Sequence, residues 1–424
     1  MRLITLVTLA AFSVNSYANH HEPTDQYETP GEVGSADYLP AVLQAGPNHT
    51  VSSIAVSDGF QNTYIISSEF GQFAVTGMAA LKTRVTEVDA MAYLEAVSRA
   101  DVFVNALKDA GVETATAIAA VFTSPVKTVQ GIPGGVDRVF AGARRGFGLT
   151  KRLFQNKPDS NDIDPKDFRE MNYLVGNSER NWASELKTDP YTTNMKLRKM
   201  VSSMSVVEFI GGLPVDIALP MGAGLAVGVL GDQTEIYRQS AQQLEQKNRA
   251  CLAEFAVEAS DIDALIKASY LTPTTQTAIC NALTRLDGVA NLNQLPAMFA
   301  NSESFEATNF LLQTINLLAW YNTDAGDVAA ITEIISDDGL PYGLTVEGTV
   351  LLMLPADNLL WTDLVESRMA DIKSDEVKSL WILGAISHQA NEQLTKSGWK
   401  ISSTANSEQL KSLYNAETTS SEAD

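Results

Sequence analysis

Cysteine, histidine and positive charge are all scarce in this chain. Of its 424 residues only two are cysteine and four are histidine, and 30 lysines and arginines stand against 51 aspartates and glutamates, a net charge of −21 at pH 7. Affinity for nucleic acid comes largely from lysine and arginine side chains that displace counterions from phosphates. This charge balance therefore excludes DNA and RNA as main partners.

The motifs of several large enzyme classes are also missing. The sequence has no Gly-x-Ser-x-Gly elbow, no His-Glu-x-x-His helix and no Gly-Lys-Ser/Thr phosphate loop. No segment repeats at a period of about 20 to 50 residues, which argues against a solenoid or a propeller. Outside the N-terminal arm, only His49 and His388 are available as histidine bases. A protein without catalytic activity is the preferred interpretation, and a carboxylate-based enzyme stays open.

The N-terminus has the layout of a secretory signal peptide at residues 1–18. Arg2 precedes an apolar run at residues 3–12, and a polar stretch then ends at Ala18. The apolar run is too short to cross a hydrocarbon core, which needs about 20 residues. We therefore expect cleavage after Ala18 and export. A second apolar run at residues 217–230 contains proline and glycines, so we expect a buried helical hairpin and no transmembrane span in the mature chain.

Composition and periodicity divide the rest of the chain. An acidic stretch rich in proline and glycine predicts a mobile arm, and period-two runs at 51–56, 64–68 and 72–76 predict an antiparallel β-meander. The expected parts are a signal peptide (1–18), a mobile acidic arm (19–46), a β-meander plus helical domain (47–235), a helical domain (236–340), a small α/β unit (341–404) and a polar tail (405–424).

Helical periodicity dominates the middle of the chain. It predicts helices from about residue 85 to Gly111, over 165–186, from Asn194 onward, and over 236–259, 273–286 and 305–321. Strand-like runs at 349–354, 379–383 and 399–402 surround a helix that Ser387 caps and Gly398 ends. The fold class is therefore α+β and predominantly helical, with a small N-terminal antiparallel β-meander and a C-terminal strand-helix-strand unit.

The two cysteines, Cys251 and Cys280, fall in neighbouring helical patterns. An even pair in an oxidising compartment favours a disulfide, and two helices packed side by side would bring the thiols together. Two buried free thiols are the alternative.

Residues 131–154 form the one basic island of this acidic chain. Aromatic residues and glycines alternate there with five cations, which are Arg138, Arg144, Arg145, Lys151 and Arg152. Cations beside aromatic rings suit an anionic lipid headgroup or another anionic partner. The alternative is an internal match, in which these cations neutralise the protein's own carboxylates.

Two further groups of residues have a chemical interpretation. Cleavage after Ala18 would expose Asn19-His20-His21, whose amine, two amides and third-position imidazole match the square-planar ligands of divalent copper or nickel. A polar spacer is the alternative, and no other cofactor is expected. Asp357 and Asp363 flank Trp361 and are the candidate pair for glycosidase-like hydrolysis, although acids beside aromatics are also common at strand ends.

Four short stretches are distinctive: residues 70–77 (FGQFAVTG), Asp189-Pro190-Tyr191 with Asn194, residues 271–274 continuing to 286–288, and Pro355-Ala356-Asp357 with Trp361-Thr362. Together they resemble an uncharacterised exported bacterial protein family with no assigned activity. The resemblance implies a bacterial envelope protein, periplasmic or extracellular, and it brings no catalytic residues. These observations favour an exported, soluble, acidic envelope protein that binds or scaffolds, with a lipid or an unidentified protein as partner. A carboxylate-based hydrolase and a periplasmic copper or nickel binder are the alternatives.

The exported chain should begin at Asn19, and mass spectrometry of the mature N-terminus measures this. Copper titration should then detect a metal site, because the free amine lies two residues before the imidazole of His21. A chain that begins at another residue lacks this site, and an intact Met1 on protein recovered from the cytoplasm would contradict export.

Overall fold

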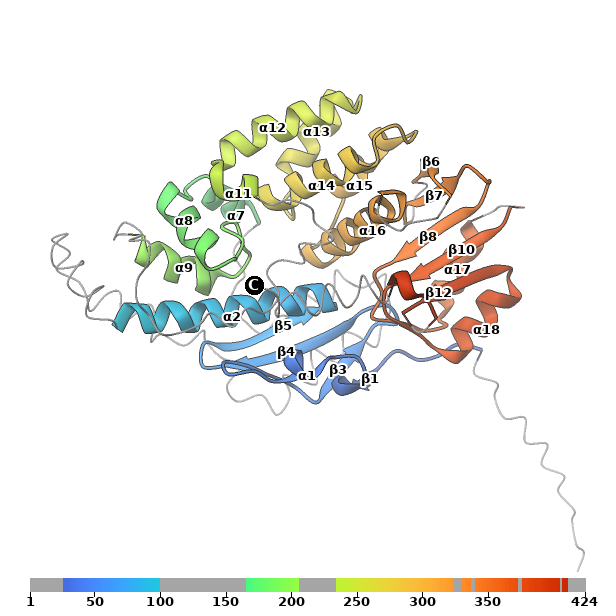
Figure 1. Ribbon diagram of the computed structural model, residues 1–424, viewed down its shortest axis with the longest axis horizontal. Coiled ribbons are helices and arrows are strands. Elements are labelled where there is room, and N and C mark those ends of the chain that lie inside the picture. The colour runs from blue at the N-terminus through green and yellow to red at the C-terminus, as the bar shows by residue number, and fades with distance from the viewer. Residues whose placement is uncertain are drawn as a thin grey trace, which may run out of the picture.

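The computed structural model describes residues 26–99, 165–205, 234–323, 329–336, 340–372, 376–404 and 406–410. Within these ranges the chain forms an antiparallel sheet near the N-terminus and a mixed sheet near the C-terminus, with helices above and between them (Figure 1). The fold is therefore α+β, as the sequence predicts, although the excess of helix over strand is modest.

The N-terminal sheet contains the predicted meander. Its strands are β1 (Glu32–Gly34), β2 (Thr50–Val51), β3 (Ile54–Ser57), β4 (Asn62–Ser68) and β5 (Gly71–Thr76). Both β2 and β3 pair with the same edge of β4, so the predicted run at 51–56 is one strand interrupted at Ser52 and Ser53. Turns between these strands contain Gly59 and Gly71, where φ is 98° and 122°, values that glycine adopts without steric cost.

Residues 26–46 differ from the expected mobile arm. Strand β1 pairs with β3, and the 3-10 turn η1 (Ser35–Asp37) and the helix α1 (Ala41–Gln44) follow it. Leu39 and Leu43 are buried in the same core as Tyr64 and Ile66 of β4. The acidic, proline-rich composition concealed these two leucines, whose burial holds the segment on the sheet.

Helix α2 (Met78–Arg99) covers the sheet and packs against β4, β5 and α9 (Figure 1). Its inward face is apolar and includes the fully buried Leu81, Val88 and Met91. The predicted continuation of this helix to Gly111 lies outside the described residues.

The middle of the described chain is helical, as predicted. The elements are α7 (Pro165–Asn172), α8 (Asn177–Glu185), α9 (Met195–Met204), α11 (Thr234–Arg238), α12 (Ala241–Glu254), α13 (Ala259–Lys267), α14 (Pro273–Arg285), η3 (Leu292–Gln294), α15 (Leu295–Ala300) and α16 (Phe305–Thr323). The predicted helix at 236–259 is divided, because the Ser240 hydroxyl accepts the N–H of Gln243 and starts α12 there. Helix α16 is buried on nearly all sides and lies beside β8 of the C-terminal sheet.

The C-terminal sheet contains the predicted strand-helix-strand unit. Its strand order is β12-β10-β8-β7-β6, with bounds β6 (Ile331–Ile335), β7 (Tyr342–Thr345), β8 (Val350–Leu354), β10 (Lys378–Ile382) and β12 (Trp399–Ser403). Strand β10 runs parallel to β8 and β12, and α18 (His388–Lys396) makes the crossover. The remaining elements are the paired β9 (Asn358–Leu359) and β11 (Ala385–Ile386) and the helix α17 (Asp363–Asp371).

Asp357 connects the two sheets. Its carboxylate follows β8 and accepts the N–H of Asn62 at the start of β4 (2.9 Å) and the N–H of Met78 at the start of α2 (3.1 Å). Burial raises the pKa of Asp357 to about 7, although both hydrogen bonds lower it, and the nearby Asp58 raises it further. One side chain therefore caps α2 and fixes the C-terminal unit to the meander.

Replacement of Asp357 by alanine should lower the free energy of unfolding by about 2 to 4 kcal/mol, because two buried N–H groups lose their acceptor. Asp363→Ala is the matched control. Asp363 is exposed in the first turn of α17, so its loss should cost less than about 1 kcal/mol. Urea unfolding measures both values, and equal losses would contradict this role for Asp357.

The stabilising effect of Asp357 should also depend on pH. Since its folded pKa of about 7 exceeds the ordinary 3.8, its contribution is complete below pH 3.8 and decreases as pH rises through about 7. The difference in unfolding free energy between wild type and Asp357→Ala should thus be larger at pH 5 than at pH 8. A pH-independent difference would show that the carboxyl does not bind its proton more tightly in the folded state.

Candidate functional site

A cavity of about 220 Å³ lies among α7, α8, α9 and the loop between α8 and α9. Its wall is mostly apolar and carries four charged residues. The lining residues are Met171, Leu174, Val175, Glu179, Ala183, Thr188, Asp189, Pro190, Thr192, Met195, Leu197, Arg198, Lys199, Val201 and Ser202. A concave apolar wall with a few polar groups is the usual form of a small-molecule site.

The loop between α8 and α9 places Asp189 in this wall. The Oδ1 atom of Asp189 accepts the N–H of Tyr191 at 2.8 Å, which closes a turn of the kind that Asp side chains form with their own backbone. The loop ends where the Asn194 side chain accepts the N–H of Leu197 (3.2 Å) and starts α9. Thr274, in the first turn of α14, also donates to Oδ1 of Asp189 at 2.6 Å. The carboxylate is therefore held from its own loop and from a distant helix.

The environment of Asp189 favours its neutral form more than water does. Burial raises the pKa of Asp189 to about 6, and the negative charge of Glu87 also raises it. The hydrogen bonds from Thr274 and from the N–H of Tyr191 lower the pKa, as does the positive charge of Arg198. The residue is nevertheless only half-buried. Its second oxygen, Oδ2, accepts no hydrogen bond from the described part of the chain.

Glu87 of α2 supports the other side of the same loop. This buried carboxylate accepts hydrogen bonds from the Thr192 hydroxyl and from the side-chain amide of Asn194 (3.1 Å). It also pairs with Arg84, one turn earlier on α2, at 3.2 Å. The long helix that covers the N-terminal sheet thus fixes the position of the cavity loop.

Arg198 projects from α9 toward the end of α7. Its guanidinium donates to the side chain of Asn172 (2.9 Å) and to the carbonyl of Met171 (3.0 Å), and its central carbon lies 5.3 Å from the centre of the Phe168 ring. Burial lowers the pKa of Arg198, although Asp189 raises it. These contacts use the cation to hold the wall of the cavity together.

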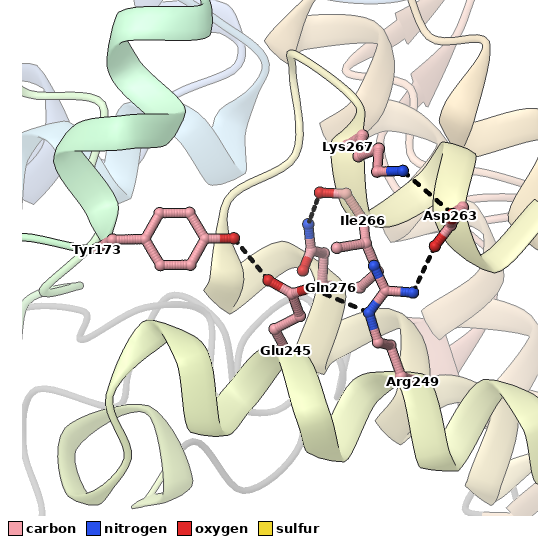
Figure 2. Close-up of polar contacts among 7 residues, drawn as sticks. All are labelled: Tyr173, Glu245, Arg249, Asp263, Ile266, Lys267 and Gln276. Atoms are coloured by element: carbon pink, nitrogen blue, oxygen red, sulfur yellow. Dashed lines mark hydrogen bonds and ion pairs between the residues drawn. The ribbon is translucent and has the colours of Figure 1, made fainter.

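Figure 2 shows how the same wall is attached to α12 and α13. The Tyr173 hydroxyl donates to Glu245 at 2.6 Å, and burial and this carboxylate raise the pKa of Tyr173 to about 12. Arg249 bridges Glu245 (3.0 Å) and Asp263 (2.6 Å), and Lys267 completes the chain of ion pairs at 3.1 Å from Asp263. Tyr173 lies between the lining residues Met171 and Leu174, so this network anchors that segment.

The two carboxylates selected from the sequence have different surroundings. Asp357 is buried and both of its oxygens accept backbone N–H groups, whereas Asp363 is exposed and accepts the N–H of Leu364. In these positions Asp357 has a structural role, and nothing directs Asp363 toward it as the second member of a catalytic pair. The cavity residues Asp189 and Arg198 were not selected as site residues, because their sequence pattern is that of a turn followed by a helix.

Cys251 and Cys280 are brought together on α12 and α14. They are free thiols in hydrogen-bonding contact, and the Cys251 thiol and burial raise the pKa of Cys280 far above its usual range. The Cys280 thiol also donates to the carbonyl of Asn248 at 3.6 Å. Both alternatives, a disulfide and a reduced pair, therefore stay compatible with this packing.

The other predicted sites lie outside the described residues. These are the basic island with Arg138, Arg144, Arg145, Lys151 and Arg152, the N-terminal triplet Asn19-His20-His21, the signal peptide and the apolar run at 217–230. Where the chain is described, no helix is both long and apolar enough to cross a bilayer. No group of three or more histidine, cysteine or acidic side chains suited to a metal ion occurs among the same residues.

No protein-family model, curated protein or solved structure matches this chain. Two of the four distinctive sequence stretches, 189–194 and 271–288, contact each other, and Asp357 of a third stretch contacts the residue that follows the fourth. Thr274 binds Asp189, and Asp357 binds the N–H of Met78, the residue after Gly77. The fold and the site thus define an α+β protein with a small, mostly apolar cavity.

The contact between Cys251 and Cys280 should become a disulfide when an external oxidant is present, with a stabilisation of about 2 to 4 kcal/mol. Thiol counting on protein isolated from an oxidising compartment should then give no free thiol. Reductant should lower the urea midpoint of this protein but not that of a variant with both cysteines changed to serine. Two free thiols in protein from that compartment would contradict the bridge.

Proposed function

We propose that this protein is a non-catalytic binding protein of the bacterial envelope, and that the cavity beside Asp189 holds a small ligand with an apolar body. The cavity itself carries the proposal. Its apolar wall gains free energy when it excludes water, and the fixed polar groups of one loop would orient what enters. Export is supported by the signal-like residues 1–18, and a net charge of −21 favours solubility.

Contact with an anionic lipid or an anionic protein partner belongs to the same proposal but to another part of the chain. It rests on the cations of the basic island, residues 131–154. Changing Arg144 and Arg145 to glutamate should abolish sedimentation of the protein with anionic liposomes. Unchanged sedimentation would remove the island from the binding surface.

The ligand cavity should bind 1-hexanol, a neutral molecule with a short apolar body, with a Kd of about 1 mM. Saturation-transfer NMR measures this directly. Ser202→Phe should abolish the signal, because Ser202 is exposed on α9 and lines the cavity, so a phenyl ring there occupies the space without disturbing the core.

Ser203→Phe is the matched control. Ser203 is the next residue of the same helix and does not line the cavity. This variant should bind 1-hexanol like wild type. Failure of the wild-type protein to bind, or equal binding by both phenylalanine variants, would refute the cavity as a ligand site.

A further inference from the structure

We propose that the ligand of this cavity carries a cationic amine on its apolar body, and that Oδ2 of Asp189 accepts the hydrogen bond from this amine. The inference rests on the proposed function, since it assumes that the cavity is a ligand site. It adds the chemical class of the ligand and the residue that recognises it.

The first support is the geometry of the Asp189 carboxylate. Thr274 and the N–H of Tyr191 both donate to Oδ1, so the orientation of the group is fixed before a ligand enters. Oδ2 accepts no hydrogen bond from the described residues, although the residue is half-buried and lines the cavity. A half-buried carboxylate oxygen gains most from a charged donor, because such hydrogen bonds are about twice as strong as neutral ones.

The second support is that neither cation of the cavity wall, Arg198 or Lys199, donates a hydrogen bond to Asp189. Arg198 donates to Asn172 and to the carbonyl of Met171, and it forms no ion pair with Asp189. Lys199 is exposed and has no ion-pair partner in the described chain. Arg198 acts on Asp189 only through its charge, which favours the ionised carboxylate, and neither cation donates a hydrogen bond to Oδ2.

The third support is the charge around the cavity. Glu87 lies behind the loop and adds negative potential at Asp189. The wall itself carries two carboxylates, Asp189 and Glu179, and two cations, Arg198 and Lys199, and the Glu179 side chain already accepts the N–H of Gly176. The net charge of −21 raises the local concentration of cations and lowers that of anions. An alkylamine matches both parts of the site, since its chain contacts the apolar wall while its ammonium group faces Asp189.

Recognition of an amine by Asp189 would depend on pH. The Asp189 carboxylate must be ionised to bind an amine, and burial raises its pKa to about 6. The hydrogen bonds from Thr274 and Tyr191 and the charge of Arg198 lower this pKa, whereas the charge of Glu87 raises it. An alkylammonium ion stays charged over this range, because aliphatic amines lose their proton near pH 10. The preference for an amine should therefore be complete above about pH 7 and decrease as pH falls through 6.

The test compares three probes with the same chain, hexylammonium, 1-hexanol and hexanoate, titrated into the full-length protein by NMR. At pH 8 hexylammonium should bind about tenfold more tightly than 1-hexanol, and hexanoate should bind most weakly. At pH 5 the preference for hexylammonium over 1-hexanol should fall to about twofold, as expected if only the ionised tenth of the Asp189 population recognises the amine.

Two variants assign the preference to one residue. Asp189→Asn keeps Oδ1 as the acceptor for Thr274 and Tyr191 but replaces Oδ2 by an N–H donor, so it should bind hexylammonium and 1-hexanol equally. Glu170→Gln removes an exposed carboxylate of α7 that does not line the cavity, so this control should keep the wild-type preference. If Asp189→Asn is unstable, the pH series on wild type tests the same point.

The outcomes separate the two proposals. Equal binding of hexylammonium and 1-hexanol to wild type at pH 8 would overturn amine recognition while the ligand cavity stands. Tighter binding of hexanoate would overturn it in favour of anion recognition. Loss of the preference in the control Glu170→Gln to the same extent as in Asp189→Asn would assign it to the net negative charge and overturn the role of Asp189. Failure of all three probes to bind would refute the cavity itself.

Discussion

The structure depends on one carboxylate, that of Asp357. It accepts N–H groups from the first residues of β4 and α2, and so it joins the end of β8 to the N-terminal sheet and to the helix above that sheet. A buried charge is costly without such partners, and burial accordingly raises the pKa of this group to about 7. Asp357 thus joins the two sheets together with the backbone hydrogen bonds from Asn358 to Phe60 and from Leu360 to Gly59.

Asp189 in the loop between α8 and α9 is also held by hydrogen bonds to its carboxylate. Like Asp357, Asp189 accepts a donor from a distant element, the hydroxyl of Thr274, but its second donor is the N–H of Tyr191 in its own turn. This difference is the basis of the proposed ligand recognition. Both oxygens of Asp357 accept hydrogen bonds from the protein, whereas the described chain donates only to Oδ1 of Asp189.

Much of the fold could be predicted from local patterns. The period-two runs located β4 and β5, the capping residue Ser387 located the start of α18, and helical periodicity located α9, because these signals act over a few residues. The strands β6 and β7 and the packing of residues 26–46 were missed. Their formation depends on partners that lie far away along the chain, such as the core around Tyr64 that buries Leu43.

The sequence by itself determined the acidic character of the protein, its helical and strand periods, and the pair of cysteines. Only the tertiary structure decided which acidic side chains are buried and which hydrogen-bond donors they have. Asp357 and Asp363 both lie beside Trp361 in the sequence, yet Asp357 is buried and Asp363 is exposed. Asp189 is held in the cavity wall because α14 brings the hydroxyl of Thr274 to its carboxylate. Burial and hydrogen-bond partners depend on contacts between distant segments, and short-range patterns carry no information about them.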